Sequence, residues 1–283
     1  MNVKLIALDL DGTTLNPQNQ LTEKTKHALY GAVRAGAEIV PVTGRCYKSL
    51  PPQLLELECS GEKAVRYVIT SNGAEIRSTQ NAEVLYHDYI SPSGVEEIKQ
   101  FLHKKDRMVE VYVKGSAYIE YAWYKKIAQN RIPYRDREYV METRVPVRGV
   151  VNLLDVHNTR IEKVAVYFEQ EVLRDRMEEE LAMIKHAHVT SSGRKNIEFV
   201  AESCNKAKTL KLLCGKLHID MPDVMAAGDS RNDIEMLQSV GISVAMGNGE
   251  DCVKACADYI AGSNECDGLA GALEDLIGIQ DKQ

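Results

Sequence analysis

A chain of 283 residues is long enough to bury a sizeable core, as one large domain or two modest ones. Its net charge of −6 argues against a nucleic-acid-binding protein, which would present a basic face to the phosphate backbone, but permits a small anionic substrate. The seven scattered cysteines disfavour a zinc site and, with the lack of any apolar run of about 18 residues, favour a cytoplasmic protein without membrane contact.

The first segments of the chain alternate between strand-like and helix-like patterns. Residues 3–8 are almost continuously apolar and end at Asp9, as expected for a central parallel strand buried on both faces. A helix is predicted over 22–35, and further strands over 38–43 and 67–70. This alternation predicts an α/β fold with a Rossmann-like parallel-sheet core.

The pattern changes between about residues 84 and 191. Residues 108–113 and 117–121 flank a Lys-Gly-Ser turn, which predicts an antiparallel hairpin. One helix is expected to carry Leu173, Met177, Leu181 and Ile184 on a single stripe. We interpret this stretch as an inserted α+β cap domain that folds over the core as a lid.

The α/β pattern resumes near Asn196. A helix is predicted over 205–218, and strands over 222–227 and 242–246. The predicted core is therefore discontinuous, comprising residues 1–83 and 192–283, with the cap over 84–191. The sequence is compatible with either a monomer or a weak dimer.

Polar side chains stand where the predicted core strands end, which is the edge at which open α/β sheets bind ligands. Asp9 and Asp11 are two residues apart, so in an extended strand they share a face at roughly 6.6 Å along the chain. Their mutual repulsion favours a bound cation, and Mg²⁺ is the natural partner of carboxylate and carbonyl oxygens. One acid would act as nucleophile and the other in proton transfer.

A second acidic pair, Asp229 and Asp233, lies four residues apart at a strand-to-helix junction, although Asp233 could instead serve the helix dipole. Lys206 and Lys208 stand at the start of a helix, where a cation is disfavoured by about 0.3–1 kcal/mol, so a lysine there indicates a bound phosphate. Gly12 allows a sharp turn whose amides face that phosphate.

Together these motifs resemble those of the haloacid dehalogenase superfamily. Residues 9–15 (DLDGTTL) are similar to its first motif, 43–45 (TGR) to its second, Lys206 to its third and 228–233 (GDSRND) to its fourth, in the family's order. Residues 244–248 and 263–268 resemble the Cof-type branch of sugar-phosphate phosphatases. Lys206 is followed by Ala207 where the family usually has glycine, which leaves Lys208 as an alternative.

The resemblance implies a role for each matching residue. Asp9 would attack phosphorus, and Asp11 would protonate the leaving oxygen and later activate water. The expected magnesium ligands are Asp9, Asp11 through its backbone carbonyl, Asp229 and, in support, Asp233. The expected phosphate- or substrate-binding residues are Gly12, Thr43, Gly44, Arg45, Lys206 and Asn232.

The resulting prediction is a magnesium-dependent phosphatase that acts on a small phosphorylated metabolite, with sugar phosphates first and flavin or pyridoxal phosphates next. A phosphomutase, a non-enzymatic phospho-receiver and a regulatory protein without catalysis are the alternatives. The arginine-rich stretch 131–148 could contact the substrate or form a solvated loop. Asn72 and Asn248 could serve the site or only the turns in which they lie.

Overall fold

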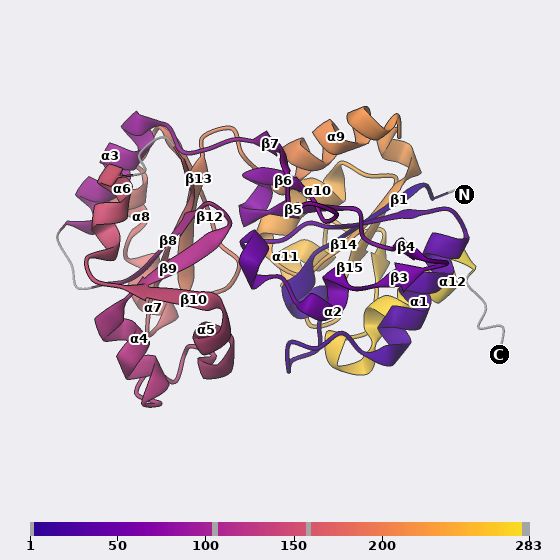
Figure 1. Cartoon of the computed structure of the whole chain (residues 1–283), viewed down its shortest axis with the longest axis horizontal. Helices are drawn as coiled ribbons and strands as arrows, with labels where there is room; N and C mark the ends of the chain where they lie inside the picture. The colour runs from indigo at the N-terminus through magenta and orange to yellow at the C-terminus, as the bar shows by residue number, and fades with distance from the viewer. Residues whose placement is uncertain (1–2, 104–106, 157–159, 279–283) are drawn as a thin grey trace. The chain divides into compact units, whose positions relative to one another are not determined.

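The computed structural model describes residues 3–103, 107–156 and 160–278. The chain divides into two compact units (Figure 1). The first unit comprises Met1–Gly44, Leu50–Tyr86 and Asn205–Gln283, and the second comprises Arg45–Ser49 and His87–Cys204. No helix in the described part of the chain combines the length and the apolar composition needed to cross a bilayer.

The first unit is built on a five-stranded sheet in which every neighbouring pair is parallel. Its central strand β1 (Leu5–Leu8) is buried along its whole length, as the apolar run predicts for a strand covered on both faces. The predicted parallel α/β core is thereby confirmed. The strand order is β16 (Tyr259–Ile260), β15 (Ile242–Ala245), β14 (Val224–Gly228), β1 and β2 (Glu38–Pro41).

Helices cover this sheet, and side chains cap the two longest of them. The hydroxyl of Thr22 accepts the N–H of Thr25 before α1 (Glu23–Arg34), and Asn205 accepts the N–H of Lys208 at the start of α9 (Lys206–Leu217). Leu210 of α9 belongs to the apolar cluster under the sheet. The other helices are α2 (Pro52–Leu55), α10 (Ile234–Gln238), α11 (Asp251–Lys254) and α12 (Gly268–Ile277), which packs against α1.

The predicted strand β5 (Tyr67–Thr70) forms, but it pairs mainly outside the central sheet. It lies in an antiparallel three-stranded sheet with β6 (Glu75–Ser78) and β7 (Val84–His87). A single parallel bridge between Val42 and Ile69 joins it to the end of β2. A short hairpin, β3 (Glu58–Cys59) and β4 (Glu62–Lys63), precedes it.

The second unit contains a six-stranded, mostly antiparallel sheet. The predicted hairpin forms as β8 (Met108–Val113) and β9 (Ser116–Glu120). Val111 and its neighbours on one face pack on α3 (Pro92–Leu102), and the alternate residues Glu110 and Tyr112 lie on the other face. The strand order is β10 (Arg144–Val147), β9, β8, β11 (Ile161–Tyr167), β13 (Asn196–Ala201) and β12 (Ala187–Thr190).

The domain boundaries and one helix differ from the sequence-based expectation. Residues 84–86, assigned to the cap, lie in the first unit, and residues 45–49, assigned to the core, lie in the second. Residues 192–204, assigned to the core from their pattern, lie in the second unit because β13 pairs with β11 and β12. The expected helix through Leu173 and Ile184 is two short ones, α7 (Glu171–Asp175) and α8 (Glu178–Leu181). The N–H of Met177 bonds to the carbonyl of Arg174, three residues back, so the backbone tightens there and the apolar stripe is interrupted.

The arginine-rich stretch 131–148 is not a solvated loop. It forms α5 (Arg137–Thr143) and β10, which follow α4 (Tyr121–Ala128). Arg144 donates from Nε to the buried carboxylate of Glu110 at 2.9 Å, and Arg135 donates to the other oxygen of the same carboxylate. Two of these arginines therefore stabilise the sheet of the second unit.

Candidate active site

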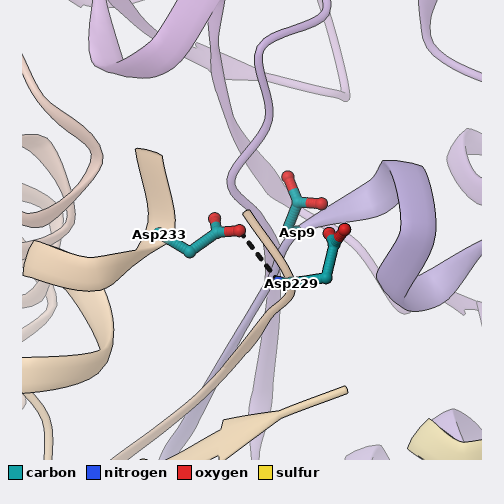
Figure 2. Close-up of side chains that lie close together, drawn as sticks. All are labelled: Asp9, Asp229 and Asp233. Atoms are coloured by element: carbon teal, nitrogen blue, oxygen red, sulfur yellow. Dashed lines mark hydrogen bonds between the residues drawn. The ribbon is translucent and has the colours of Figure 1, made fainter. Parts of the chain in front are cut away.

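The candidate site is an acidic cluster at the carboxyl edge of the parallel sheet. Asp9 follows β1 and Asp229 follows β14, and these two strands are hydrogen-bonded neighbours. Asp233 stands four residues further on, in the turn before α10. One carboxylate oxygen of each acid lies within 4.8 Å of those of the other two, and Figure 2 shows the three side chains converging.

Lys206 brings a buried cation into this acidic cluster. Its Nζ donates to Oδ1 of Asp9 at 2.5 Å and to Oδ1 of Asp233 at 2.6 Å, and its side chain is fully buried. The sequence left open whether Lys206 or Lys208 takes this position. The structure places Lys206 in the cluster, whereas Lys208, two residues further along α9, is half-buried.

The electrostatics of the cluster favour an additional cation. Burial raises the pKa of Asp9 well above its ordinary value, although the ammonium of Lys206 opposes this effect. Burial, followed by the charge of Asp233, raises the pKa of Asp229 to about 7. Burial alone would lower the pKa of Lys206, but Asp233 and Asp9 hold it above its ordinary value. Three carboxylates with one ammonium leave an excess of negative charge, and their oxygen donors suit a hard divalent cation.

Asp233 shapes the turn that carries Asp229. Its Oδ2 accepts the backbone N–H groups of Asp229 and Ser230, both at 3.0 Å, while its Oδ1 accepts from Lys206. Gly228 makes room for this arrangement, because a Cβ there would lie 2.5 Å from the Cβ of Asp233. Asp233 therefore joins Lys206 to the loop that holds Asp229.

Gly12, in the first motif, lies against the carboxylate of Asp229. It has φ of +78°, and a Cβ at this position would lie 2.6 Å from Oδ2 of Asp229. Thr13 donates from its hydroxyl to the other oxygen of Asp229 at 3.1 Å. The turn after Asp9 thus positions the carboxylate of Asp229. The role predicted from the sequence, in which the amides of this turn face a phosphate, stays a prediction.

Asp11 is exposed, and its carboxylate is not among the three clustered acids. Its negative charge adds to the influences that raise the pKa of Asp9. An exposed acid two residues from Asp9 is placed where it can exchange protons with solvent or a bound molecule. The predicted metal contact of Asp11 was through its backbone carbonyl and stays a prediction.

The second motif is divided between the two units. Thr43 is fully buried after β2, where its N–H donates to Ile69 and its carbonyl accepts from Asn72. Gly44 ends that segment of the first unit, and Arg45 begins a segment of the second. There, the guanidinium of Arg45 donates to the carbonyl of Ser49 at 3.2 Å and lies 4.5 Å from the ring centroid of Tyr139. The contacts described for Arg45 do not bring it to the acidic cluster.

Asn232 and Asn72 link the fourth motif to the loop after β5. Nδ2 of Asn232 donates to Oδ1 of Asn72 at 3.1 Å. Oδ1 of Asn232 is buried and has no hydrogen-bond partner among the described residues. The predicted contact of Asn232 with the phosphate stays a prediction.

Short polar side chains fix the turn after β1; sequence reasoning assigned no role to Thr14 and Asn264 and left the role of Asn248 open. Thr14 donates from its hydroxyl to the carbonyl of Asp9 at 2.6 Å, and Asn248 donates to the carbonyl of Gly12 at 2.8 Å. Asn264 donates through Nδ2 to the carbonyl of Leu15 at 2.8 Å. The hydroxyl and amide residues stand within or after the motifs, but the bonds of Asn248 and Asn264 join residues more than 200 positions apart and have no local pattern.

Comparisons with known proteins identify the family of the chain. The family model of the haloacid dehalogenase-like hydrolases matches residues 6–273. The chain is 29% identical to the 5-amino-6-(5-phospho-D-ribitylamino)uracil phosphatase YcsE of Bacillus subtilis, over 98% of this chain and 97% of that protein. It is 28% identical to the pyridoxal phosphate phosphatase YbhA of Escherichia coli, over 95% of this chain and 97% of that protein.

A solved structure of a haloacid dehalogenase-like hydrolase from Bacillus subtilis superposes with a TM-score of 0.81 at 25% identity, covering 96% of this chain and 99% of the other. The resemblance indicated by the four motifs is therefore confirmed, and with it the fold. With a family model spanning nearly the whole sequence and the acidic cluster at the sheet edge, the chain belongs to the haloacid dehalogenase-like hydrolases.

Proposed function

We propose that the protein is a magnesium-dependent phosphatase that hydrolyses a small phosphorylated metabolite through a phosphoryl group carried by Asp9. The observation that carries the proposal is the buried contact of Asp9 with Lys206 inside a cluster that has excess negative charge. The carboxylate of Asp9 contacts one fixed cation, and the cluster around it is negative enough to bind a second, divalent cation. With both positive charges present, this carboxylate can approach an anionic phosphate.

The proposed reaction has two steps. A carboxylate oxygen of Asp9 forms a bond to phosphorus as the ester P–O bond breaks, and the leaving oxygen takes a proton from Asp11. Asp11 then accepts a proton from water, whose oxygen attacks phosphorus and releases Asp9 and inorganic phosphate.

The remaining residues bind the phosphate group and the magnesium ion and orient them toward Asp9. Lys206 offsets charge on Asp9 and on the phosphate oxygens, and Thr43 and the amides after Gly12 would hold those oxygens. Asp9, Asp229 and Asp233 would hold magnesium, which when bound supplies positive charge against the phosphate. The two curated relatives named above act on phosphorylated compounds of metabolite size, which supports a small phosphomonoester as substrate, with sugar phosphates included.

The test is phosphate release from a panel of sugar, flavin and pyridoxal phosphates, with and without magnesium. We expect release to require magnesium and to be abolished by Asp9→Asn, which is nearly isosteric but a poor nucleophile. Asp251→Asn, at an exposed position in α11, is the matched control and keeps full activity. Release that survives chelation, or that survives in Asp9→Asn, contradicts the proposal.

The same assay separates the phosphatase from a phosphomutase. In ¹⁸O-labelled water, hydrolysis places the label in inorganic phosphate, whereas a mutase returns the phosphoryl group to an organic acceptor without label. A phospho-receiver would instead keep a long-lived phosphoryl group on Asp9 and turn over little substrate.

A further inference from the structure

The second unit contains a cavity of about 430 Å³ that the proposed reaction does not use. It lies where β8 begins and β11 ends, at the level of the paired residues Met108 and Tyr167. This is the end of β8 opposite the hairpin turn at Gly115. All of its lining residues belong to the second unit, whereas the acidic cluster belongs to the first. Its volume is in the range of small-molecule sites.

Aromatic side chains from three parts of the unit form the walls. Trp123 comes from α4, Tyr134 from the segment before α5, and Tyr167 and Phe168 from the end of β11. The guanidinium of Arg135 lies 3.6 Å from the ring centroid of Tyr167 and holds that ring in place. Aromatic walls of this kind accommodate a flat apolar body.

Arg107 supplies a guanidinium with hydrogen-bonding capacity to spare. Its side chain is 6% exposed, and Nη2 contacts only the sulfur of Met177 at 2.9 Å and, at 3.4 Å, an oxygen of Glu180 among its described polar partners. Nη1 is buried and has no hydrogen-bond partner in the described part of the chain. A carboxylate that drew this side chain toward the cavity would satisfy it with two parallel hydrogen bonds.

The charges around the cavity set the charge of the ligand. Arg107 and Arg176 line it together with one acid, Glu169, so the lining residues carry one net positive charge. Behind the lining, Glu180 contacts Arg107, and the cations of Lys126 and Arg135 lie over the rings of Trp123 and Tyr167, so the surroundings remain net positive. This balance matches a monoanion better than a phosphate dianion, because Glu169 would repel a second negative charge.

We propose that this cavity binds a flat, apolar monocarboxylate, at a site separate from the acidic cluster. The apolar body lies against Trp123 and Tyr134, and the carboxylate is held by Arg107 with Arg176 at the rim.

Trp123 is the chain's only tryptophan and lines the cavity, so its fluorescence reports binding there. The experiment titrates the full chain with 4-nitrobenzoate, whose nitro group quenches tryptophan, and with its uncharged counterpart 4-nitrobenzamide. We expect saturable quenching by the acid and binding of the amide weaker by about tenfold or more, since a charged hydrogen-bonded pair is lost.

Arg176→Gln is the decisive variant, because Arg176 is exposed and its replacement leaves the fold intact. It should weaken 4-nitrobenzoate several-fold, and Arg107→Gln should weaken it by about tenfold, with circular dichroism confirming that each variant is folded. Arg174→Gln, two residues earlier in α7 and outside the cavity lining, is the matched control and should leave the affinity unchanged.

Three results would overturn the proposal. The first is equal quenching by the acid and the amide. The second is an unchanged affinity in folded Arg176→Gln. The third is displacement of 4-nitrobenzoate by inorganic phosphate with magnesium, which would place the quencher at the acidic cluster. None of these results bears on phosphate release by Asp9, so the two proposals stand or fall separately.

Discussion

The ammonium nitrogen of Lys206 lies 2.5 Å from Oδ1 of Asp9, and the same nitrogen lies 2.6 Å from Oδ1 of Asp233. One buried cation thus connects the proposed nucleophile to the residue that shapes the loop of Asp229. Because Lys206 opens α9 directly after the capping residue Asn205, the orientation of that helix positions the ammonium. The catalytic geometry therefore depends on the register of a helix whose first residue is part of the site.

Lys206→Met should reduce the rate of phosphate release by about a hundredfold or more, because one charged group that faces the phosphate is lost. It should also lower the free energy of unfolding by roughly 3–5 kcal/mol, since two buried acids lose their cation. The assays are phosphate release at saturating substrate and thermal unfolding. Lys208→Met, on the same helix and half-buried, is the control; a larger effect of Lys208→Met would assign the third motif to Lys208.

Gly12→Ala should weaken the affinity for magnesium, because the added Cβ would lie 2.6 Å from the carboxylate of Asp229 and displace this proposed magnesium ligand. The measurement is the magnesium concentration that gives half-maximal activity. Gly36→Ala is a matched control, since Gly36 also has a positive φ (+92°) but has no atom within 4 Å of the added Cβ. Both variants should lose about 1–2 kcal/mol of stability from backbone strain, and only Gly12→Ala should need more magnesium.

The sequence predicts those parts of the site that depend on local patterns, and it does not predict contacts between residues far apart in the chain. Asp9 and Asp229 were predictable because each ends a buried strand, and parallel strands bring their carboxyl ends to one edge. The contact of Thr13 with Asp229 was not, because it depends on the exact turn at Gly12. The same holds for the second unit, in which the antiparallel pairing of β8 with β9 was predictable from the hairpin pattern. Its strand β13 was not, because a strand's partner is chosen by packing and not by its own pattern.

The prediction for Arg45 stays a prediction. Its position directly after Thr43 and Gly44 predicted a residue facing the phosphate, and its described contacts are with Ser49 and Tyr139 of the second unit. A short motif defines neighbours along the chain, but it does not define which contacts each side chain makes.

Asp11→Asn should separate the two chemical steps. With an activated substrate whose leaving group needs no proton, the variant should still transfer phosphate to Asp9 and then stall, because no base activates water. Rapid-quench measurement should give a burst of leaving group close to one equivalent per enzyme, followed by slow release of inorganic phosphate. The absence of a burst in Asp11→Asn, with a burst retained in wild type, would mean that Asp11 is required before the first transfer. Because Asp11 is exposed, we expect the variant to keep its fold, which circular dichroism checks.

Glu110→Gln should destabilise the second unit in a pH-dependent way. Burial opposes the charge of Glu110, but Arg135 and Arg144 outweigh it and lower the pKa of its carboxyl to about 2 from 4.5. The native state therefore binds the proton less tightly than the unfolded state. The ionised carboxylate of Glu110 therefore contributes about 3 kcal/mol to the free energy of unfolding. This contribution is complete above pH 4.5 and is lost as the pH falls toward 2.

Urea unfolding followed by the fluorescence of Trp123, which lies in the same unit, measures this difference between pH 7 and pH 3. The gap between wild type and Glu110→Gln should be widest at pH 7 and should narrow steadily below pH 4.5. Glu142→Gln, at an exposed position of α5, is the control and should track wild type throughout. A gap of constant size across the pH range would show that Glu110 acts through its shape and hydrogen bonds, and that its charge contributes nothing to the stability of the sheet.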